Sequence, residues 1–327
     1  MAPFPRALLL LPLAASALVL DGHVHLSNLS LVYPWSAPCP DAPCPSAPPC
    51  LCEWTAADYT AATTRLPADR FVFVEVAVAQ AQWLAEARWV QALADGGEAR
   101  VGGIVAQPPP GFGVPGADPA ALGAALDELA ALPLARGVRL SAIDFTNASL
   151  LPTAVAHVAL LAARGLRSVD VIVGVGELAL AAGNLAALAA AAPTVTFVLD
   201  HLGTPPYLLA NASLLPGWSA AIAQLGAVPN FVCKVGGVLQ GYKSTLSLPG
   251  VETVRPFVEH ALRSFGYSKS RERARDGGRE SARARSRSPP RTPLLHSPRP
   301  PVPRSVYEGN WFFVNWLVPA ELDTYNL

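Results

Sequence analysis

The stretch Asp21-Gly22-His23-Val24-His25 decides the fold of this chain. Side chains of a strand alternate between its two faces, so Asp21, His23 and His25 are expected to line one face. The residues on either side are apolar, which predicts a buried strand whose polar end opens into a pocket. Two histidines satisfied by hydrogen bonds in a core are the structural alternative. The pattern D-x-H-x-H at the first strand of a β/α series favours a functional site instead.

Downstream of Trp54, short apolar runs alternate with longer Ala- and Leu-rich segments of helical periodicity. We expect eight strands, at Leu18–His25, Phe71–Ala77, Val101–Ala106, Gly137–Ser141, Val169–Val173, Thr196–His201, Asn230–Val235 and Ser305–Trp311. The helical patterns between them cover Ala56–Arg65, Ala79–Leu93, Pro119–Leu132, Pro152–Arg164, Leu178–Ala192, Ser219–Leu225 and Val251–Ser264. Parallel strands joined by right-handed crossovers follow, and eight such repeats predict an α/β fold of the (β/α)8 TIM barrel type. A doubly wound open sheet is the alternative, but no Gly-rich phosphate loop follows the first strand.

The composition fits a barrel of this size. The 327 residues are 51% hydrophobic and 15% charged, which allows a large core. The formal net charge of zero hides an uneven distribution, because residues 268–304 hold 11 Lys and Arg against 3 Asp and Glu. This segment carries +8 and the remainder carries −8. A body of that sign gives no argument for nucleic acid, so we expect a small-molecule partner.

The first 17 residues have the features of a secretory signal peptide. Arg6 precedes the apolar run Ala7–Leu13, and Ala15-Ser16-Ala17 offers a cleavage site of small residues. The apolar run is too short to span a bilayer, so no membrane span is expected. An apolar lead-in to the first strand is the alternative. Secretion gains support from the three N-x-S sequons at Asn28, Asn147 and Asn211.

Four of the five cysteines, Cys39, Cys44, Cys50 and Cys52, belong to one Pro-rich segment. They can form two disulfides or bind a metal ion. No histidine accompanies them and the chain has a signal-like start, so disulfides are favoured. Cys233 lies in an apolar, strand-like run and is expected to be a buried thiol.

Polar residues stand at or near the ends of the expected strands. They are His23, His25, Glu75, Arg139, His201, Lys234 and Asn310. Each has a structural explanation, since Glu75 can pair with Lys234, Arg139 can form a surface ion pair and Asn310 can cap a turn. In a barrel of this type, however, the carboxyl ends of all strands meet at one mouth, where active sites lie. Their convergence there favours a functional role.

These residues belong to a series of motifs that resembles a known family. The series is D-G-H-V-H-L from Asp21, Tyr33-Pro34-Trp35, F-V-F-V-E-V with Glu75, R-G-V-R ending at Arg139, V-L-D-H-L-G-T-P from Val198, C-K-V-G-G from Cys233, and F-G at Phe265. In order and spacing it resembles the amidohydrolase 2 branch of the amidohydrolase superfamily. Within that branch the chain is similar to sugar lactonases such as L-fuconolactone and L-rhamnonolactone hydrolases.

The resemblance implies a barrel of the metal-dependent hydrolase type that opens a lactone or similar cyclic ester. His23, His25 and His201 would polarise the carbonyl, directly or through a divalent metal such as zinc. A carboxylate on the last strand would activate water. Glu75, Arg139 and Lys234 would contact the substrate, a lactone or sugar acid.

The chain departs from the family pattern at two places. Where the family shows G-S-D-W-P, this chain has Glu308-Gly309-Asn310-Trp311-Phe312, and an amide cannot take a proton from water. Asp200 is expected to face away from His201 and so not to replace the missing carboxylate. A barrel that binds such ligands with weak or absent activity is therefore the alternative to an enzyme. The sequence also continues only about sixteen residues past the last expected strand, so the final helix is expected to be missing.

The expected organisation has four parts: a signal peptide at 1–17, strands one to seven of the barrel at 18–267, an insert at 268–304, and the last strand with a truncated C-terminus at 305–327. The insert is rich in Arg, Ser and Pro and offers little to bury, so it is expected to be disordered. Its Arg-Ser tracts leave an RNA-associated protein as a third hypothesis, which conflicts with a signal peptide and lacks an aromatic stacking platform.

Overall fold

The structure is a computed structural model and describes residues 20–35, 37–38, 50–64, 67–205, 215–237, 251–266 and 305–307. The predicted signal peptide, most of the Cys-rich segment, the Arg-rich insert and Asn310 lie outside the described residues. So does any helix after the last strand.

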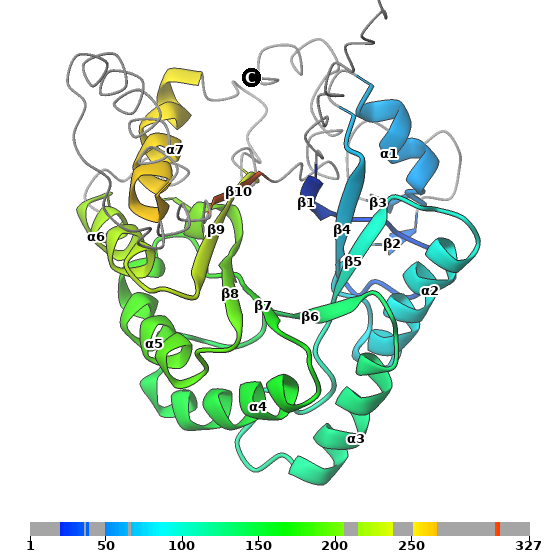
Figure 1. Cartoon of the computed structure of the whole chain (residues 1–327), viewed down its shortest axis with the longest axis horizontal. Coiled ribbons are helices and arrows are strands. Elements are labelled where there is room, and N and C mark those ends of the chain that lie inside the picture. The colour runs from blue at the N-terminus through cyan, green and yellow to red at the C-terminus, as the bar shows by residue number, and fades with distance from the viewer. Residues whose placement is uncertain are drawn as a thin grey trace, which may run out of the picture.

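Eight parallel strands form one sheet in chain order. They are β1 (Leu20–Val24), β4 (Arg70–Val74), β5 (Val101–Ala106), β6 (Ala135–Leu140), β7 (Ser168–Val171), β8 (Thr196–Leu199), β9 (Phe231–Val235) and β10 (Ser305–Tyr307). β10 pairs with β9 and also contacts β1, so the sheet curves round upon itself (Figure 1). The predicted barrel and its eight strands are thereby confirmed. A separate parallel pair, β2 (Ala37–Pro38) and β3 (Cys50–Leu51), belongs to the connection after β1 and was not predicted.

Helices follow the strands and surround the sheet, as Figure 1 shows. The α-helices are α1 (Ala56–Ala62), α2 (Trp83–Asp95), α3 (Pro119–Ala130), α4 (Leu151–Ala163), α5 (Leu178–Ala191), α6 (Leu215–Gly226) and α7 (Val251–Phe265). Three short 3-10 turns are η1 (Gln80–Gln82), η2 (Ala148–Leu150) and η3 (Asp200–Gly203). All seven predicted helical segments are present, with ends shifted by a few residues. Within the described ranges, none of the helices combines the length and the apolar character that crossing a bilayer requires.

Local sequence sets where helices begin. Thr55 accepts a hydrogen bond from the backbone of Asp58, and the Asp58 side chain accepts one from Thr55, a capping box that starts α1. Asp118 caps α3 and Pro119 occupies its first turn, where a missing N–H costs nothing.

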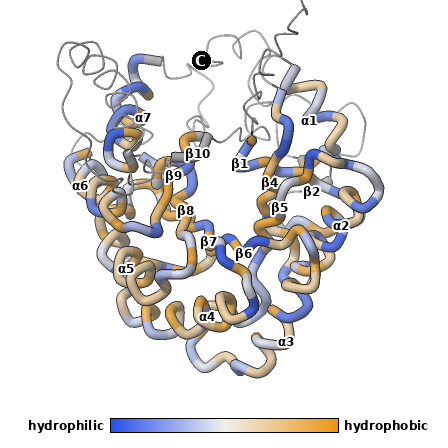
Figure 2. Tube along the Cα trace, viewed as in Figure 1, coloured by the Kyte–Doolittle hydropathy of each residue, from blue (hydrophilic) through white to orange (hydrophobic). Residues whose placement is uncertain are grey.

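The core lies between the strands and the inner faces of the helices, where apolar residues gather (Figure 2). Phe73 on β4 meets Trp89 on α2 edge to face, with ring centroids 6.4 Å apart. Phe197 and Phe231 stack between neighbouring strands β8 and β9 at 5.8 Å. Each fully buried aromatic contributes roughly 2–3 kcal/mol, so this layer holds the strand ends in place.

One glycine permits the closest approach between two strands. A Cβ added to Gly137 on β6 would lie 1.7 Å from the backbone oxygen of Ser168 on β7. No other residue type fits there without separating the strands. Because β6 and β7 carry two of the site residues described below, this contact fixes their relative height.

Strand β8 ends earlier than predicted. It stops at Leu199 instead of continuing to His201. His201 and Leu202 have φ values of 55° and 57°. These lie in the left-handed region of backbone conformation, which residues other than glycine rarely adopt. The chain therefore leaves the strand at Asp200, which changes the direction of both side chains at this point.

Candidate active site

Eight buried polar residues meet at the carboxyl ends of the strands. They are His23, His25, Glu75, Arg139, Asp170, Asp200, His201 and Lys234. All eight are less than a tenth exposed. Charged groups are rarely buried unless they are paired, so the cluster must be interpreted as a network.

His23 on β1 and His25, the first residue after it, face each other. His23 Nε2 and His25 Nε2 are 3.0 Å apart, with the rings nearly perpendicular. His25 Nδ1 lies 2.9 Å from the backbone oxygen of Val74 on β4 and donates its proton there. The Nε2 of a neutral His25 therefore presents a lone pair toward the site. Burial, then Arg139, lowers the pKa of His25 to about 3, so the ring is neutral near pH 7.

His23 links this pair to the cations. Its Nδ1 lies 3.2 Å from Lys234 Nζ and 3.6 Å from Asp200 Oδ1. Burial, then Lys234, holds the pKa of His23 well below its usual value. Without a metal, Lys234 donates to Nδ1 and His23 donates from Nε2 to His25. With the protons placed in this way, each of the four ring nitrogens of His23 and His25 has a hydrogen-bond partner.

Lys234 on β9 forms the centre of a second group. Its ammonium donates to Asp170 on β7 in a short contact and lies 3.3 Å from Asp200 Oδ1. Burial raises the pKa of Asp170 to about 6, against the opposing effect of Lys234. Asp170 was not predicted from the sequence. The only signal was an acidic residue inside the short apolar run of β7, one strand away from Arg139 and in register with it.

Glu75 and Arg139 form the third group. Arg139 Nε donates to Glu75 Oε1 at 2.5 Å, and its NH2 group donates to the Glu75 backbone oxygen at 3.0 Å. Glu75 Oε2 accepts the N–H of Ala77, whose φ of 53° bends the chain away from β4. Burial alone would lower the pKa of Arg139, but Glu75 and then Asp200 raise it. The predicted alternative of a Glu75–Lys234 pair is wrong, because each has a different partner.

Asp200 is placed differently from the prediction. It was expected to face away from His201, but His23, Asp200 and His201 bring one ligand atom each within 4.8 Å of one another. The prediction assumed a strand through His201, and the turn after Leu199 removes that assumption. Burial alone would raise the pKa of Asp200, but Lys234 and then His23 hold it well below its usual range. It is therefore an ionised carboxylate inside the cluster at neutral pH.

Strict alternation along the first strand predicted that Asp21 lies on the same face as His23 and His25, and the structure departs from that alternation. The pairing of β1 with β4 shifts register between Asp21 and Val24, so the residues of β1 do not alternate evenly. Asp21 accepts hydrogen bonds from the Tyr59 hydroxyl of α1 at 3.1 Å and from the His23 backbone. It orients β1 from the helix side. Asn310, the remaining predicted residue, lies outside the described residues.

The charge of the cluster leaves room for a cation. Glu75, Asp170 and Asp200 contribute three carboxylates against the two cations Arg139 and Lys234. The lowered pKa values of His23 and His25 keep both rings neutral. Nearby Glu86 does not change the sum, because burial, then Glu75, raises its pKa well above its usual value. An excess negative charge in a buried site is costly unless a cation offsets it.

The donor atoms also fit a divalent metal. Two Zn–N bonds of about 2.0–2.1 Å at a tetrahedral angle separate the nitrogens by roughly 3.3 Å, close to the 3.0 Å between the two Nε2 atoms. The bond from His25 Nδ1 to Val74 is the outer-shell support that metal-bound histidines need. Both Asp200 oxygens are buried and accept no hydrogen bond from the described residues. His23 Nδ1 faces one of them and can donate to it when its Nε2 binds a metal.

Comparisons with known proteins agree with the barrel fold. A family model described as Amidohydrolase (Amidohydro_2) matches residues 20–269. An amidohydrolase structure from Burkholderia multivorans with bound zinc has a TM-score of 0.63 at 19% identity, covering 94% of this chain and 88% of that one. A probable 2-pyrone-4,6-dicarboxylic acid hydrolase structure from Acinetobacter baumannii, with citric acid bound, has a TM-score of 0.50 at 13% identity, covering 90% and 84%.

A curated relative matches over a shorter length. It is the uncharacterized protein y4mH of Sinorhizobium fredii, 32% identical over 78 residues. The match spans 24% of each of the two chains.

Proposed function

Because the chain belongs to the Amidohydrolase family described by the Amidohydro_2 model, we propose that it is a hydrolase that opens a lactone or similar cyclic ester of a sugar acid. The observation that carries this proposal is the meeting of a histidine pair, an ionised carboxylate and two buried cations at the carboxyl ends of the strands. Such a mouth is where barrels of this type perform chemistry. The zinc in the Burkholderia structure supports a divalent ion in the proposal.

His23, His25 and His201 would hold the ion, with Asp200 beside them. When bound, such an ion supplies a Lewis acid for the ester carbonyl. The chain itself contributes the orientation of these rings, through the hydrogen bonds from His25 to Val74 and from His23 to its neighbours.

Asp200 takes the role of the proton acceptor. Its Oδ2 has no hydrogen bond from the described residues and is 4.0 Å from an Arg139 guanidinium nitrogen. Oδ2 accepts the proton of the attacking water and returns it to the ring oxygen that leaves as an alkoxide. Against the effect of burial, Lys234 and then His23 hold the pKa of Asp200 below its usual range, so the carboxylate is ionised and has a lone pair to accept a proton at neutral pH. The absence of a carboxylate at Asn310 then no longer removes the base, and the proposal is an active enzyme.

The cations keep substrate oxygens in position. Arg139 binds Glu75 through two of its nitrogens, and its third points toward Asp200. A carbonyl or hydroxyl oxygen of the substrate between Arg139 and Asp200 would be held at the place where the water attacks. Lys234 offsets the charge of Asp170 and Asp200 on the opposite side.

A panel of sugar lactones assayed with a pH indicator tests this function. Each hydrolysis releases an acid, so a dye reports turnover directly. We expect proton release from at least one aldonolactone, lost on substitution of His25 by Asn. A zinc-loaded protein that binds these lactones without hydrolysing them would support the ligand-binding barrel instead. The panel includes a pyrone dicarboxylate, the class in the name of the Acinetobacter structure.

We also propose that the protein enters the secretory pathway. Cys52 is disulfide-bonded, which suits an oxidising compartment and the signal-like start of the sequence. Expression of the full chain in secreting cells, followed by analysis of the medium and of the new N-terminus, tests this proposal.

A further inference from the structure

Gln107 is the first residue after β5 and carries a buried side-chain amide. The residue is only 9% exposed. Its carbonyl oxygen, Oε1, is buried and accepts no hydrogen bond from the described residues. Buried polar atoms of folded proteins nearly always have a partner, so an acceptor of this kind indicates a group that arrives from outside the chain.

The neighbouring hydrogen bonds fix which end of this amide lacks a partner. Gln80 on η1 donates from Nε2 to the backbone oxygen of Pro108 at 2.9 Å. A carbonyl oxygen only accepts, so the NH2 group of Gln80 must face Pro108 and its Oε1 must point elsewhere. Gln107 Nε2 donates to that Oε1 at 2.9 Å. The remaining atom of Gln107 is therefore an acceptor, and the group that it lacks is a donor.

The sheet places this acceptor beside the catalytic cluster. β5 lies between β4 and β6, so the ion pair from Glu75 to Arg139 crosses the end of β5. Ala106 pairs with Val138. Gln107 and Arg139 are the next residues on these neighbouring strands, which lie about 4.8 Å apart. The carboxyl ends of the strands form the mouth of such a barrel, so Gln107 stands where a ligand of Arg139 would bind.

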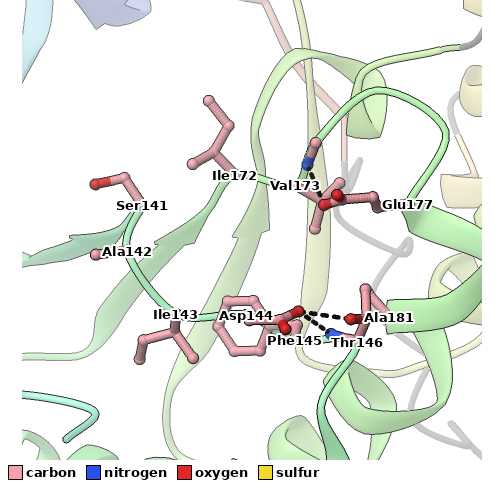
Figure 3. A pocket seen from close by; sticks show the side chains of 11 residues that line it. Ser141, Ala142, Ile143, Asp144, Phe145, Thr146, Ile172, Val173, Glu177 and Ala181 are labelled. Atoms are coloured by element: carbon pink, nitrogen blue, oxygen red, sulfur yellow. Dashed lines mark hydrogen bonds between the residues drawn. The ribbon is translucent and has the colours of Figure 1, made fainter.

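A pocket on the other side of β6 provides a contrast. It has a volume of about 320 Å³ and lies between the segments that follow β6 and β7 (Figure 3). The carboxylates that line it, Asp144 and Glu177, are exposed, and each accepts a hydrogen bond from its own loop. Exposed carboxylates are satisfied by water. Gln107 Oε1 is buried, so the argument for a ligand applies to it and not to that pocket.

We propose that Gln107 is a substrate-binding residue whose Oε1 accepts a hydrogen bond from a hydroxyl group next to the reacting carbonyl. This inference rests on the proposed lactone hydrolysis, in which a substrate oxygen lies between Arg139 and Asp200. The donor must belong to an atom near that oxygen, because Gln107 is only one strand away from Arg139. Gln107 takes no part in the bond that breaks.

Calorimetry with two δ-lactams tests this contact without hydrolysis. One lactam has a hydroxyl on the carbon next to the carbonyl, and the other has none. The unmodified protein should bind the hydroxylated lactam about 10-fold more tightly, the upper range for a neutral hydrogen bond, because Oε1 is already out of water in the free protein. Gln107→Met removes the acceptor and should bind both lactams equally. An unmodified protein without this preference, or a preference that survives in Gln107→Met, would overturn the inference.

The corresponding two lactones separate this inference from the proposed function. If neither is hydrolysed but the lactam preference exists and is lost in Gln107→Met, the function is wrong and the inference stands. If both are hydrolysed with the same KM by the unmodified protein, the inference is wrong and the function stands.

Urea unfolding gives a second test that needs no ligand. Gln91 on α2 is the matched control, because it is also buried but its Oε1 accepts the N–H of Leu134 at 2.9 Å. Gln91→Met leaves that N–H without its acceptor. Gln107→Met loses only the bond to exposed Gln80, which can turn to water. We expect the unfolding free energy to fall less in Gln107→Met than in Gln91→Met. An equal or larger fall would mean that Oε1 is already satisfied in the folded protein, which overturns the inference.

Discussion

At the scale of single residues, the site depends on pairs of buried charges that a sequence does not display. The D-x-H-x-H stretch was enough to predict His23 and His25, because two histidines two positions apart share a face of a strand. Asp170 could not be predicted, because one acidic residue in a short apolar run has many explanations. Its meaning comes from Lys234, 64 residues away in sequence and in direct contact with it.

Removal of one member of this pair should destabilise the fold. Asp170→Asn keeps the shape but leaves Lys234 without its closest counter-charge. Breaking a buried pair in this way typically costs about 3–5 kcal/mol of unfolding free energy. Urea unfolding measures it. The exposed pair of Arg88 with Glu128 provides the control, since Glu128→Gln should cost less than about 1 kcal/mol. Equal losses of unfolding free energy in the two variants would show that the ion pair of Asp170 with Lys234 does not stabilise the fold more than an exposed pair does.

At the scale of strands and helices, alternation of apolar runs predicted every element of the barrel that the structure describes. Boundaries were less accurate where the backbone leaves regular geometry. β8 is the clearest case, since no local pattern announced positive φ values at His201 and Leu202. The error at this strand end caused the wrong orientation for Asp200. Strand ends in a barrel carry the chemistry, so a shift of two residues matters more there than at a helix end.

The close contact of β6 with β7 gives a prediction about these elements. In Gly137→Ala the new Cβ would collide with the Ser168 backbone oxygen, which forces two strands apart and should cost about 3 kcal/mol or more. Gly183→Ala on α5 is the matched control, because nothing lies within 4 Å of its added Cβ. That substitution should stabilise the protein by about 0.5–1 kcal/mol. Thermal unfolding measures both variants. Melting temperatures that shift in the same direction in Gly137→Ala and Gly183→Ala would contradict this prediction.

At the scale of the whole molecule, the fold buries several carboxylates whose environments differ in kind. Glu75 and Asp200 face cations. Among the described residues, the one hydrogen-bond donor to Glu86 on α2 is the Val76 N–H, at 3.3 and 3.4 Å from its two oxygens. Burial, then Glu75, raises the pKa of Glu86 well above its usual value of 4.5. Stability of the entire barrel is therefore linked to the protonation of a side chain outside the active site.

The sign of this linkage gives a pH prediction. The folded protein keeps a proton on Glu86 that the unfolded chain releases above about pH 4.5, so this contribution to stability falls as pH rises toward the folded pKa. Glu86→Gln cannot titrate. Its unfolding free energy relative to the unmodified protein should therefore increase as the pH rises from about 4.5 toward the folded pKa of Glu86. Urea unfolding at several pH values measures it. A difference that stays flat with pH, as expected for exposed Glu128→Gln, would contradict the buried neutral state of Glu86.

We propose that Asp200, and not the last-strand position, supplies the base for lactone hydrolysis. The most direct test is the turnover of an aldonolactone by the unmodified protein, Asp200→Asn and Asn310→Asp, with metal content measured on the same samples. General-base catalysis contributes about 10²–10⁴-fold, so Asp200→Asn should lose at least about 100-fold in kcat. Asn310→Asp should stay within about threefold of the unmodified protein, because its base is already present. An inactive unmodified protein that gains tenfold or more from Asn310→Asp would contradict the account and restore the last-strand carboxylate as the base.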